Sequence, residues 1–274
     1  MNEKELKLKS IYLRKQLLKY IYNAKAGHTG GSLSCIDTLN VLYNKVLNID
    51  PKNFKNPNRD RYIQSKGHCV EALFATLADR GFFPESDLET LCKYQSHYIG
   101  HPTRKVNGVE QNTGALGHGL PICVGEAIAA KLDNKTHRIF TLLGDGELPE
   151  GSNWEAFLSA SHYKLDNLYA ILDNNKQQIT GYNKDVMNTD CVREKLEAFG
   201  WSVKEVDGHN VKELEEALNN GPFEQGKPNF IIAHTIKGKG ISYMEGVTKW
   251  HHGVPSAEQY DLAIAELTAA ESLI

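Results

Sequence analysis

Apolar side chains in the first half of the chain recur at helical spacing. Residues 3–23 carry them near a period of 3.6 residues, which predicts an amphipathic helix that ends before Gly27. The same spacing predicts helices over residues 35–47, 70–79 and 121–132. In the last of these, Pro121 lies in the first turn, where its missing N–H costs nothing.

The pattern changes after residue 138, where compact apolar runs alternate with helical segments. Strands are predicted over residues 61–64, 139–143, 168–172, 203–206 and 230–233, and helices over residues 154–162 and around Leu214 and Leu218. Continuous apolar runs separated by helices are typical of parallel strands buried on both faces. We therefore expect an α/β fold, an open and mostly parallel sheet with helices on both faces. No long linker interrupts residues 1–274, so one domain is expected.

Composition and charge argue against several classes of protein. The 274 residues carry a net charge of −3 and no basic stripe, so the electrostatic footprint of a nucleic-acid or anionic-membrane partner is missing. No apolar run approaches the ~20 residues of a membrane-spanning helix, and residues 1–9 lack the apolar stretch of a secretory signal. The five cysteines form no C-x-x-C pair, which favours a reducing compartment. We expect a cytoplasmic protein.

Two polar motifs directly follow predicted strands. Gly144, Asp145 and Gly146 come after one strand, and Asn175 comes after the next. If these strands are neighbours, both motifs emerge at the same edge of the sheet, where open α/β sheets bind ligands. Carboxylate and amide oxygens suit Mg²⁺ that carries a diphosphate. The alternative is that both motifs are tight turns, since Gly, Asp and Asn are common turn formers.

The histidines are the second set of candidate functional residues. Five of the 11 histidines directly follow glycine, about five times the chance expectation of ~0.9 at this composition: His28, His68, His101, His118 and His209. As a set they predict a pocket lined with neutral, hydrogen-bonding rings, because glycine lets a loop turn sharply and point a ring into a cleft. Each one alone is better explained as an exposed loop histidine. Their spacing excludes a compact H-x-x-x-H zinc site.

Several polar residues have structural explanations. Ser152 followed by Glu155 matches a capping box, which would account for both as the start of a helix. Glu150 has no such role and could meet a ligand or a partner subunit. Near the C-terminus, Ser256 with Gln259 predicts another helix start.

Seven short motifs then follow one another in a fixed order. They are Gly27-His28-Thr29-Gly30-Gly31-Ser32, Ser65-Lys66-Gly67-His68, Gly100-His101-Pro102, Thr113-Gly114-Ala115-Leu116-Gly117, Gly144-Asp145-Gly146-Glu147 with Glu150-Gly151, Asp173-Asn174-Asn175-Lys176, and Lys237-Gly238-Lys239-Gly240. Together they resemble the N-terminal half of transketolase, the thiamine diphosphate enzyme that transfers two-carbon ketol units. The resemblance covers nearly the whole chain and is far more specific than any single motif.

The resemblance implies a cofactor site. Asp145 and Asn175 would hold Mg²⁺ through their side chains, and Gln177 through its carbonyl. His68 and Gly146 would contact the diphosphate of thiamine diphosphate. The run Gly114, Ala115 and Leu116 would pass beneath the aminopyrimidine ring. Glu150 and Glu155 are grouped with these cofactor-binding residues and would lie at the subunit contact, so for Glu155 this role competes with the capping box.

The resemblance also implies catalytic histidines. His28, His101 and one of His251 or His252 would hydrogen-bond the sugar oxygens and assist proton transfer. Alignment through Trp250 and Pro255 favours His251, and alignment through Gly253 favours His252. His118 lies where many family members have glutamine, and it is given no catalytic part.

Complete transketolases continue into a second α/β domain, and residues 1–274 contain no counterpart of it. The chain therefore resembles the N-terminal subunit of a split transketolase, active only with a C-terminal partner subunit that supplies the pyrimidine-binding half, as two copies of each. A ketose phosphate would be the donor and an aldose phosphate the acceptor, with pentose phosphates as the default and modified or sulfonated sugars as the alternative. Two other functions stay open: a subunit of a 2-oxo-acid dehydrogenase or decarboxylase, and a non-enzymatic Mg²⁺- or nucleotide-binding module.

Overall fold

Five parallel strands form one sheet in the computed structural model, which describes residues 1–274. The strands are β1 (Arg61–Gln64), β2 (Ile139–Gly144), β3 (Leu168–Asn174), β4 (Ser202–Asp207) and β5 (Asn229–His234), in the spatial order β1-β2-β3-β5-β4. Every neighbouring pair is parallel. The predicted mostly parallel α/β sheet is confirmed, and its carboxyl ends all lie at one edge.

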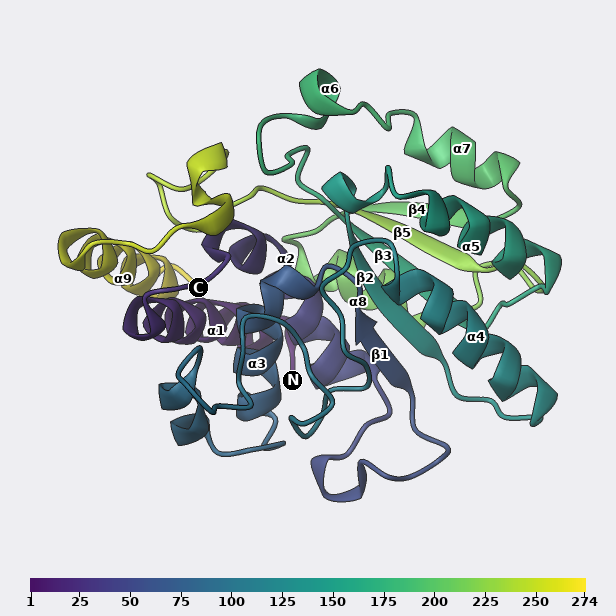
Figure 1. Cartoon of the computed structure of the whole chain (residues 1–274), viewed down its shortest axis with the longest axis horizontal. Coiled ribbons are helices and arrows are strands. Elements are labelled where there is room, and N and C mark those ends of the chain that lie inside the picture. Colours follow the sequence, from purple (N-terminus) through teal and green to yellow (C-terminus); the bar gives the residue numbers. More distant parts are fainter.

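Helices cover both faces of this sheet (Figure 1). They are α1 (Glu3–Ala24), α2 (Thr29–Val41), α3 (Val70–Asp79), α4 (Gly119–Leu132), α5 (Gly151–His162), α6 (Asn183–Val186), α7 (Val192–Ala198), α8 (Val211–Asn219) and α9 (Ala257–Glu271). No helix is long and apolar enough to span a bilayer. The helices predicted at residues 3–23 and 70–79 are confirmed almost to the residue.

Two hydrophobic clusters lie on opposite faces of the sheet. In β2, Phe140 and Leu142 pack into the larger cluster with α1, α2, α3 and α8, whereas Ile139 and Leu143 pack into the smaller one with α4, α5 and α7. Successive side chains of a strand point to opposite faces, so a strand covered on both faces has to be apolar throughout. This is why the runs at residues 139–143 and 168–172 identified buried strands.

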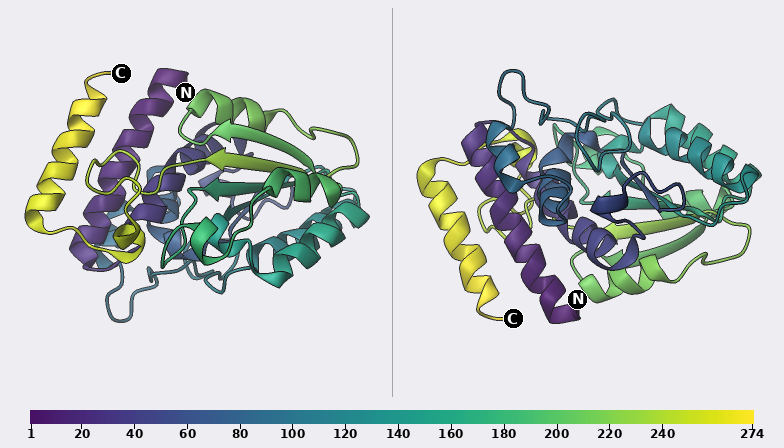
Figure 2. Two further views of the ribbon diagram at one scale, coloured as in Figure 1. Left: turned by 90° about the horizontal axis from the view of Figure 1, so that it is seen from above. Right: turned by 90° about the horizontal axis from the view of Figure 1, so that it is seen from below.

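The first and last helices lie side by side at one end of the molecule, away from the sheet (Figure 2). The rings of Tyr22 on α1 and Tyr260 on α9 stack with centroids 4.5 Å apart. The Ser256 capping box predicted at the start of α9 is present, with the Ser256 hydroxyl accepting from the Gln259 N–H at 3.2 Å. The segment before α9 contacts the start of α2, where the Gly238 N–H donates to the Gly30 carbonyl and the Thr29 hydroxyl donates to the Gly253 carbonyl.

Two predicted elements differ from the structure. Helix α2 begins at Thr29, six residues before the predicted start at residue 35. All of its residues are buried, so no polar face marks its first turns, and a Cβ at Gly31 would lie 2.6 Å from the Cys69 Sγ. Strand β4 is predicted as a buried apolar run, but it is an edge strand in which only Val206 is buried.

Candidate active site

A cavity of about 480 Å³ opens at the carboxyl ends of β1, β2 and β3. Its lining combines glycines, amides and charged groups with histidines, and only Leu116 and Ile179 contribute apolar side chains. From the set predicted by the sequence, the lining contains His28, His68, His101, His251, Gly114, Leu116, Asp145, Gly146, Asn175 and Gln177. Residues far apart in the sequence therefore share one cavity, as the motif pattern predicted.

Asp145 and Asn175 meet at one edge of the sheet because β2 and β3 are neighbours, with Gly144 opposite Asp173 in the ladder. One carboxylate oxygen of Asp145 accepts from the Gly146 N–H at 2.8 Å, and the other accepts from the Lys176 N–H. The amide oxygen of Asn175 accepts from the Gln177 N–H at 3.1 Å. The predicted convergence of the two strand ends is confirmed.

The Asp145 carboxyl is 3% exposed, and burial together with the nearby charge of Asp173 raises its pKa to about 7. Such a carboxylate is electrostatically strained unless a cation is nearby. Asp173 itself is already neutralised, since it forms a buried ion pair with Lys66 and accepts from Ser34 Oγ at 2.6 Å. Of these two aspartates, Asp145 is therefore the one whose charge is left for a cation to balance.

Five histidine rings gather at the other end of the cavity, around His28. The ring centroid of His28 lies 5.2 Å from His68, 6.2 Å from His101, 5.6 Å from His251 and 4.7 Å from His252. His251 lines the cavity, whereas His252 is exposed and is not part of the lining. The predicted histidine-lined pocket is confirmed for His28, His68 and His101.

Burial keeps several of these histidines neutral at pH 7. It lowers the pKa of His28 to about 4, and burial together with Lys237 lowers the pKa of His251 to about 3. Burial also lowers the pKa of His101. The Nδ1 atom of His251 accepts from Lys237 Nζ at 2.9 Å, so its proton lies on Nε2. Neutral rings offer one donor and one acceptor each, as the sequence predicted.

The buried side chain of Glu71 fixes the loop that carries His28. The Glu71 carboxylate accepts from the His28 N–H at 3.2 Å and from Ser32 Oγ at 2.9 Å. Gly27 leaves room for it, because a Cβ there would lie 2.8 Å from Glu71 Oε1. Burial raises the pKa of Glu71 to about 7. The ring of His28 is turned toward the other histidines, and its Nδ1 is buried without a partner.

The sequence analysis assigned no role to Glu147. In the structure, Glu147 lines the cavity and connects three segments of its wall. One oxygen of Glu147 accepts from Ser65 Oγ and from the Gly117 N–H at 2.9 Å, and the other accepts from the Gly144 N–H at 3.0 Å. Its position as the fourth residue of the Gly144–Glu147 motif was the available signal. Lys66 and Lys237 also line the cavity, although they stood in their motifs without a role.

Some predicted residues lie elsewhere. Glu150, Glu155 and Ala115 are exposed and do not line the cavity. The capping box predicted for Ser152 and Glu155 is wrong, because α5 begins at Gly151 and its N-cap is Glu150. Ser152 lies inside the helix and donates to the Gly117 carbonyl at 2.7 Å.

Two of the glycine-preceded histidines also lie outside the cavity. His118 is exposed, and its Nδ1 lies 3.0 Å from the Leu116 carbonyl. His209 contacts Asp37 on α2, with 2.8 Å between its Nδ1 and the carboxylate.

The oxygen atoms and ammonium groups that line the cavity fit an anion bound to a hard divalent cation. No group of three or more His, Cys, Asp or Glu residues is arranged to hold a metal by itself. The oxygens of Asp145, Asn175 and Gln177 share the cavity with the ammonium groups of two lysines. Gln177 Oε1 is buried without a hydrogen-bond partner. Oxygen ligands beside cationic side chains are the arrangement expected for a magnesium diphosphate.

Comparison with known families gives one clear match. The family described as "Transketolase, thiamine diphosphate binding domain" matches residues 9–267. The chain is 47% identical over 268 residues to a subunit of the apulose-4-phosphate transketolase of Phocaeicola vulgatus, and the match covers 98% of this chain and 95% of the relative. It is 40% identical over 270 residues to 6-deoxy-6-sulfo-D-fructose transketolase subunit SqwG of a Clostridium species, covering 97% of this chain and 98% of the relative.

Solved structures of the same kind share the fold. The transketolase of Campylobacter jejuni superimposes with a TM-score of 0.92 at 33% identity, covering 98% of this chain. The transketolase of Pichia stipitis, in a mutant form, superimposes with a TM-score of 0.89 at 27% identity. This chain spans only 43% and 44% of those two proteins, respectively.

Proposed function

Because the chain belongs to the family of transketolase thiamine diphosphate binding domains, we propose that it is the N-terminal subunit of a two-chain transketolase. In this proposal residues 1–274 form one thiamine diphosphate- and Mg²⁺-binding domain, and the protein transfers a two-carbon ketol unit from a ketose phosphate to an aldose phosphate. The observation that carries the proposal is the meeting of the Asp145–Asn175 edge with the histidine cluster in one cavity.

The sheet edge would hold the cofactor. Asp145 and Asn175 would bind Mg²⁺ through side-chain oxygens and Gln177 through its carbonyl, while His68 and Gly146 would contact the diphosphate. When bound, thiamine diphosphate supplies the carbanion chemistry that breaks and forms the carbon–carbon bond. Glu147 ties the Gly117 and Gly144 main chains together, which supports a fixed surface for the aminopyrimidine beside Gly114 and Leu116.

The histidine end of the cavity would bind the sugar substrate. His28, His101 and His251 line the cavity as neutral rings, so they can donate hydrogen bonds to hydroxyl and developing alkoxide oxygens without bringing charge into the site. The Nε2–H of His251 is free to donate because its Nδ1 accepts from Lys237. His252 lies outside the lining, which favours His251 as the C-terminal histidine that acts on substrate.

The substrate would be a ketose with an anionic terminus. The relatives are named for apulose 4-phosphate and for 6-deoxy-6-sulfo-D-fructose, so a phosphate and a sulfonate are both represented among similar subunits. Pentose phosphates are the third choice. Ranking kcat/KM for a donor of each kind, with the reconstituted enzyme, would identify the substrate class.

A second chain would complete the site. Three of the similar proteins are named as individual transketolase subunits, and this chain spans less than half of the solved transketolases. We infer a C-terminal partner subunit that supplies the pyrimidine-binding half, with two copies of each chain. Glu150 and Glu155, both exposed, are available for that contact.

The test is a reconstitution. The purified chain, with thiamine diphosphate, Mg²⁺, a ketose phosphate and an aldose phosphate, should turn over only when the partner chain is added. Full turnover by this chain alone would contradict the two-chain proposal. Turnover of pyruvate instead of a ketose would favour the 2-oxo-acid alternative. A thermal melt stabilised by a nucleotide but not by thiamine diphosphate would favour the non-enzymatic binding module.

A further inference from the structure

Outside the cavity, three polar side chains form a buried network. Asp37 on α2 is 2% exposed, and its carboxylate accepts two bonds from Arg14, at 3.0 Å from Nη1 and 2.5 Å from Nη2. The same carboxylate accepts from His209 Nδ1 at 2.8 Å. Although burial opposes charge on Asp37, Arg14 and His209 hold the pKa of this carboxyl well below its usual range. None of the three residues lines the cavity.

Two hydrogen bonds connect this network to the segment 236–240. His209 Nε2 accepts from the Ile236 N–H at 2.9 Å, and Arg14 Nε donates to the Lys239 carbonyl at 3.2 Å. Because Nε2 accepts, the proton of the neutral ring lies on Nδ1, which donates to Asp37. One ionised carboxylate therefore orients both groups that hold the segment.

These two anchor points flank Lys237, which does line the cavity. Lys237 is 3% exposed and its Nζ donates to His251 Nδ1 at 2.9 Å. The main chain beside it is fixed to the start of α2, since the Gly238 N–H donates to the Gly30 carbonyl at 2.9 Å. A Cβ at Gly30 would lie 3.0 Å from Lys237 Cγ, so the lysine stem passes directly over the helix start.

We propose that Asp37 and His209 are positioning residues that fix the segment 236–240 and thereby place the Lys237 ammonium where an anionic group bound in the cavity needs it. Neither residue touches the ligand. The identity of that anion, the diphosphate of the cofactor, rests on the proposed function. The placement of the segment by His209 does not, because it follows from hydrogen bonds within this chain. The same network gives a role to the Gly208-His209 pair, which does not line the cavity.

Two variants separate the two bonds of His209. Glutamine places its amide oxygen near the position of Nε2, so His209→Gln keeps the acceptor for Ile236 and gives up the donor to Asp37. Asparagine places its amide nitrogen near the position of Nδ1, so His209→Asn keeps the donor to Asp37 and gives up the acceptor for Ile236. The Ile236 side of this bond is exposed, so water can replace the lost acceptor and global stability should change little.

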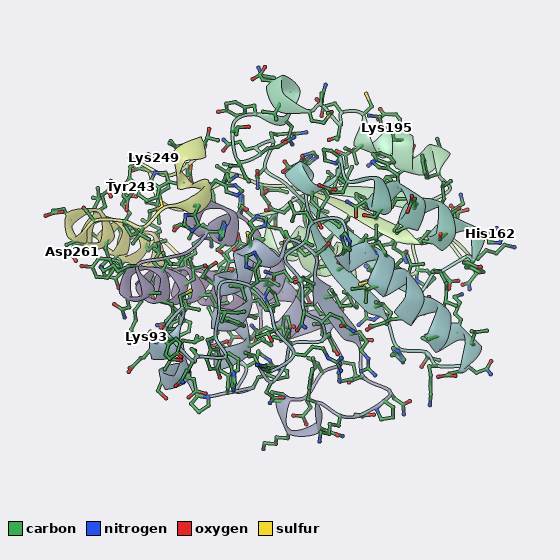
Figure 3. All side chains as sticks on the ribbon, viewed as in Figure 1. Lys93, His162, Lys195, Tyr243, Lys249 and Asp261 are labelled. Carbon is green, nitrogen blue, oxygen red and sulfur yellow. The ribbon has the colours of Figure 1, made fainter.

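The full-length chain is measured in two ways: amide hydrogen exchange over residues 236–246, and titration with thiamine diphosphate in excess Mg²⁺. We expect His209→Asn to speed exchange in this segment and to weaken binding about fivefold, the effect of one hydrogen bond. His209→Gln should fall between wild type and His209→Asn in both, because it keeps the acceptor for Ile236 but loses the Asp37 bond that orients it. His162→Asn is the control, since His162 lies at the far end of the molecule from Tyr243 (Figure 3).

Wild-type exchange and affinity in His209→Asn would overturn the proposal. So would equal impairment of both variants, or faster exchange spread over the whole chain together with a lowered unfolding midpoint, because these indicate a general structural role. If the wild-type chain binds no thiamine diphosphate, the proposed function fails, while the exchange comparison still decides the role of His209.

Discussion

The two ends of the cavity are built in different ways. At the sheet edge, Asp145 and Asn175 follow two neighbouring strands, and main-chain N–H groups close by bind their oxygens. At the other end, histidine rings come from four loops between residues 28 and 251, and His28 Nδ1 has no partner within the chain. The first geometry is set by one β-ladder. The second depends on how α1, α2, α3 and the C-terminal segment pack together.

This difference predicts separable functions. Changes at the sheet edge should remove cofactor binding and leave the histidines in place, whereas replacing His28, His101 or His251 should alter turnover and leave cofactor binding nearly intact. Four substitutions test this separation.

The largest effect is expected from Asp145→Ala. Removing the Asp145 carboxylate from the edge should weaken Mg²⁺-dependent binding of thiamine diphosphate by at least about 100-fold. The fold should survive, since ionisation of this buried group opposes folding. Calorimetric titration with Mg²⁺ and with EDTA, beside a thermal melt, checks both points. Retained binding with Mg²⁺ would remove Asp145 from the metal site.

Next comes His28→Ala, in the reconstituted enzyme. We expect kcat to fall by about 100-fold or more, the usual effect of losing a group that assists proton transfer. Cofactor affinity should stay within about twofold of wild type, within the scatter of one weak contact. His162→Ala serves as the control with unchanged kcat. Loss of cofactor binding in His28→Ala would show that the two ends are not separable.

Glu147→Gln tests the link between the ends. Glu147 only accepts hydrogen bonds, from Ser65, Gly117 and Gly144, so an amide NH₂ group would face a donor. We expect cofactor affinity and kcat each to fall about tenfold, the cost of one mismatched buried bond. Unchanged affinity with reduced kcat would indicate that Glu147 serves the histidine end alone.

The smallest effect on activity is expected from Glu71→Gln, which can still accept from the His28 N–H and can donate to Ser32. Its signature is instead in stability. A folded-state pKa of about 7 against an ordinary value of 4.5 means that Glu71 stabilises the fold below about pH 4.5 and loses this contribution as pH rises through 7.

Urea unfolding at pH 5 and pH 8 measures this contribution. The difference between wild type and Glu71→Gln should change by about 2–3 kcal/mol between the two pH values, from ~1.4 kcal/mol per pKa unit. A constant difference would mean that Glu71 titrates normally and does not hold the His28 loop as a buried carboxyl.

The sequence anticipated the sheet and its ligand-binding edge well. Runs buried on both faces have to be apolar, so residues 139–143 and 168–172 identified β2 and β3 without knowledge of their partners. The start of α2 was missed because all of its residues are buried, which leaves no helical periodicity to read. Strand β4 was assigned too much burial because pairing at the edge of the sheet is not visible in local composition.

What the sequence determined by itself was the local chemistry: which residues end each strand, and which glycines let a loop carry a histidine. The tertiary structure decided which of those groups meet. It brought His28, His68, His101 and His251 together, left His118 exposed, and joined His209 to Asp37. Hydrogen bonds to neighbouring residues follow from local order along the chain, whereas contacts between distant loops depend on packing that no short stretch of sequence contains.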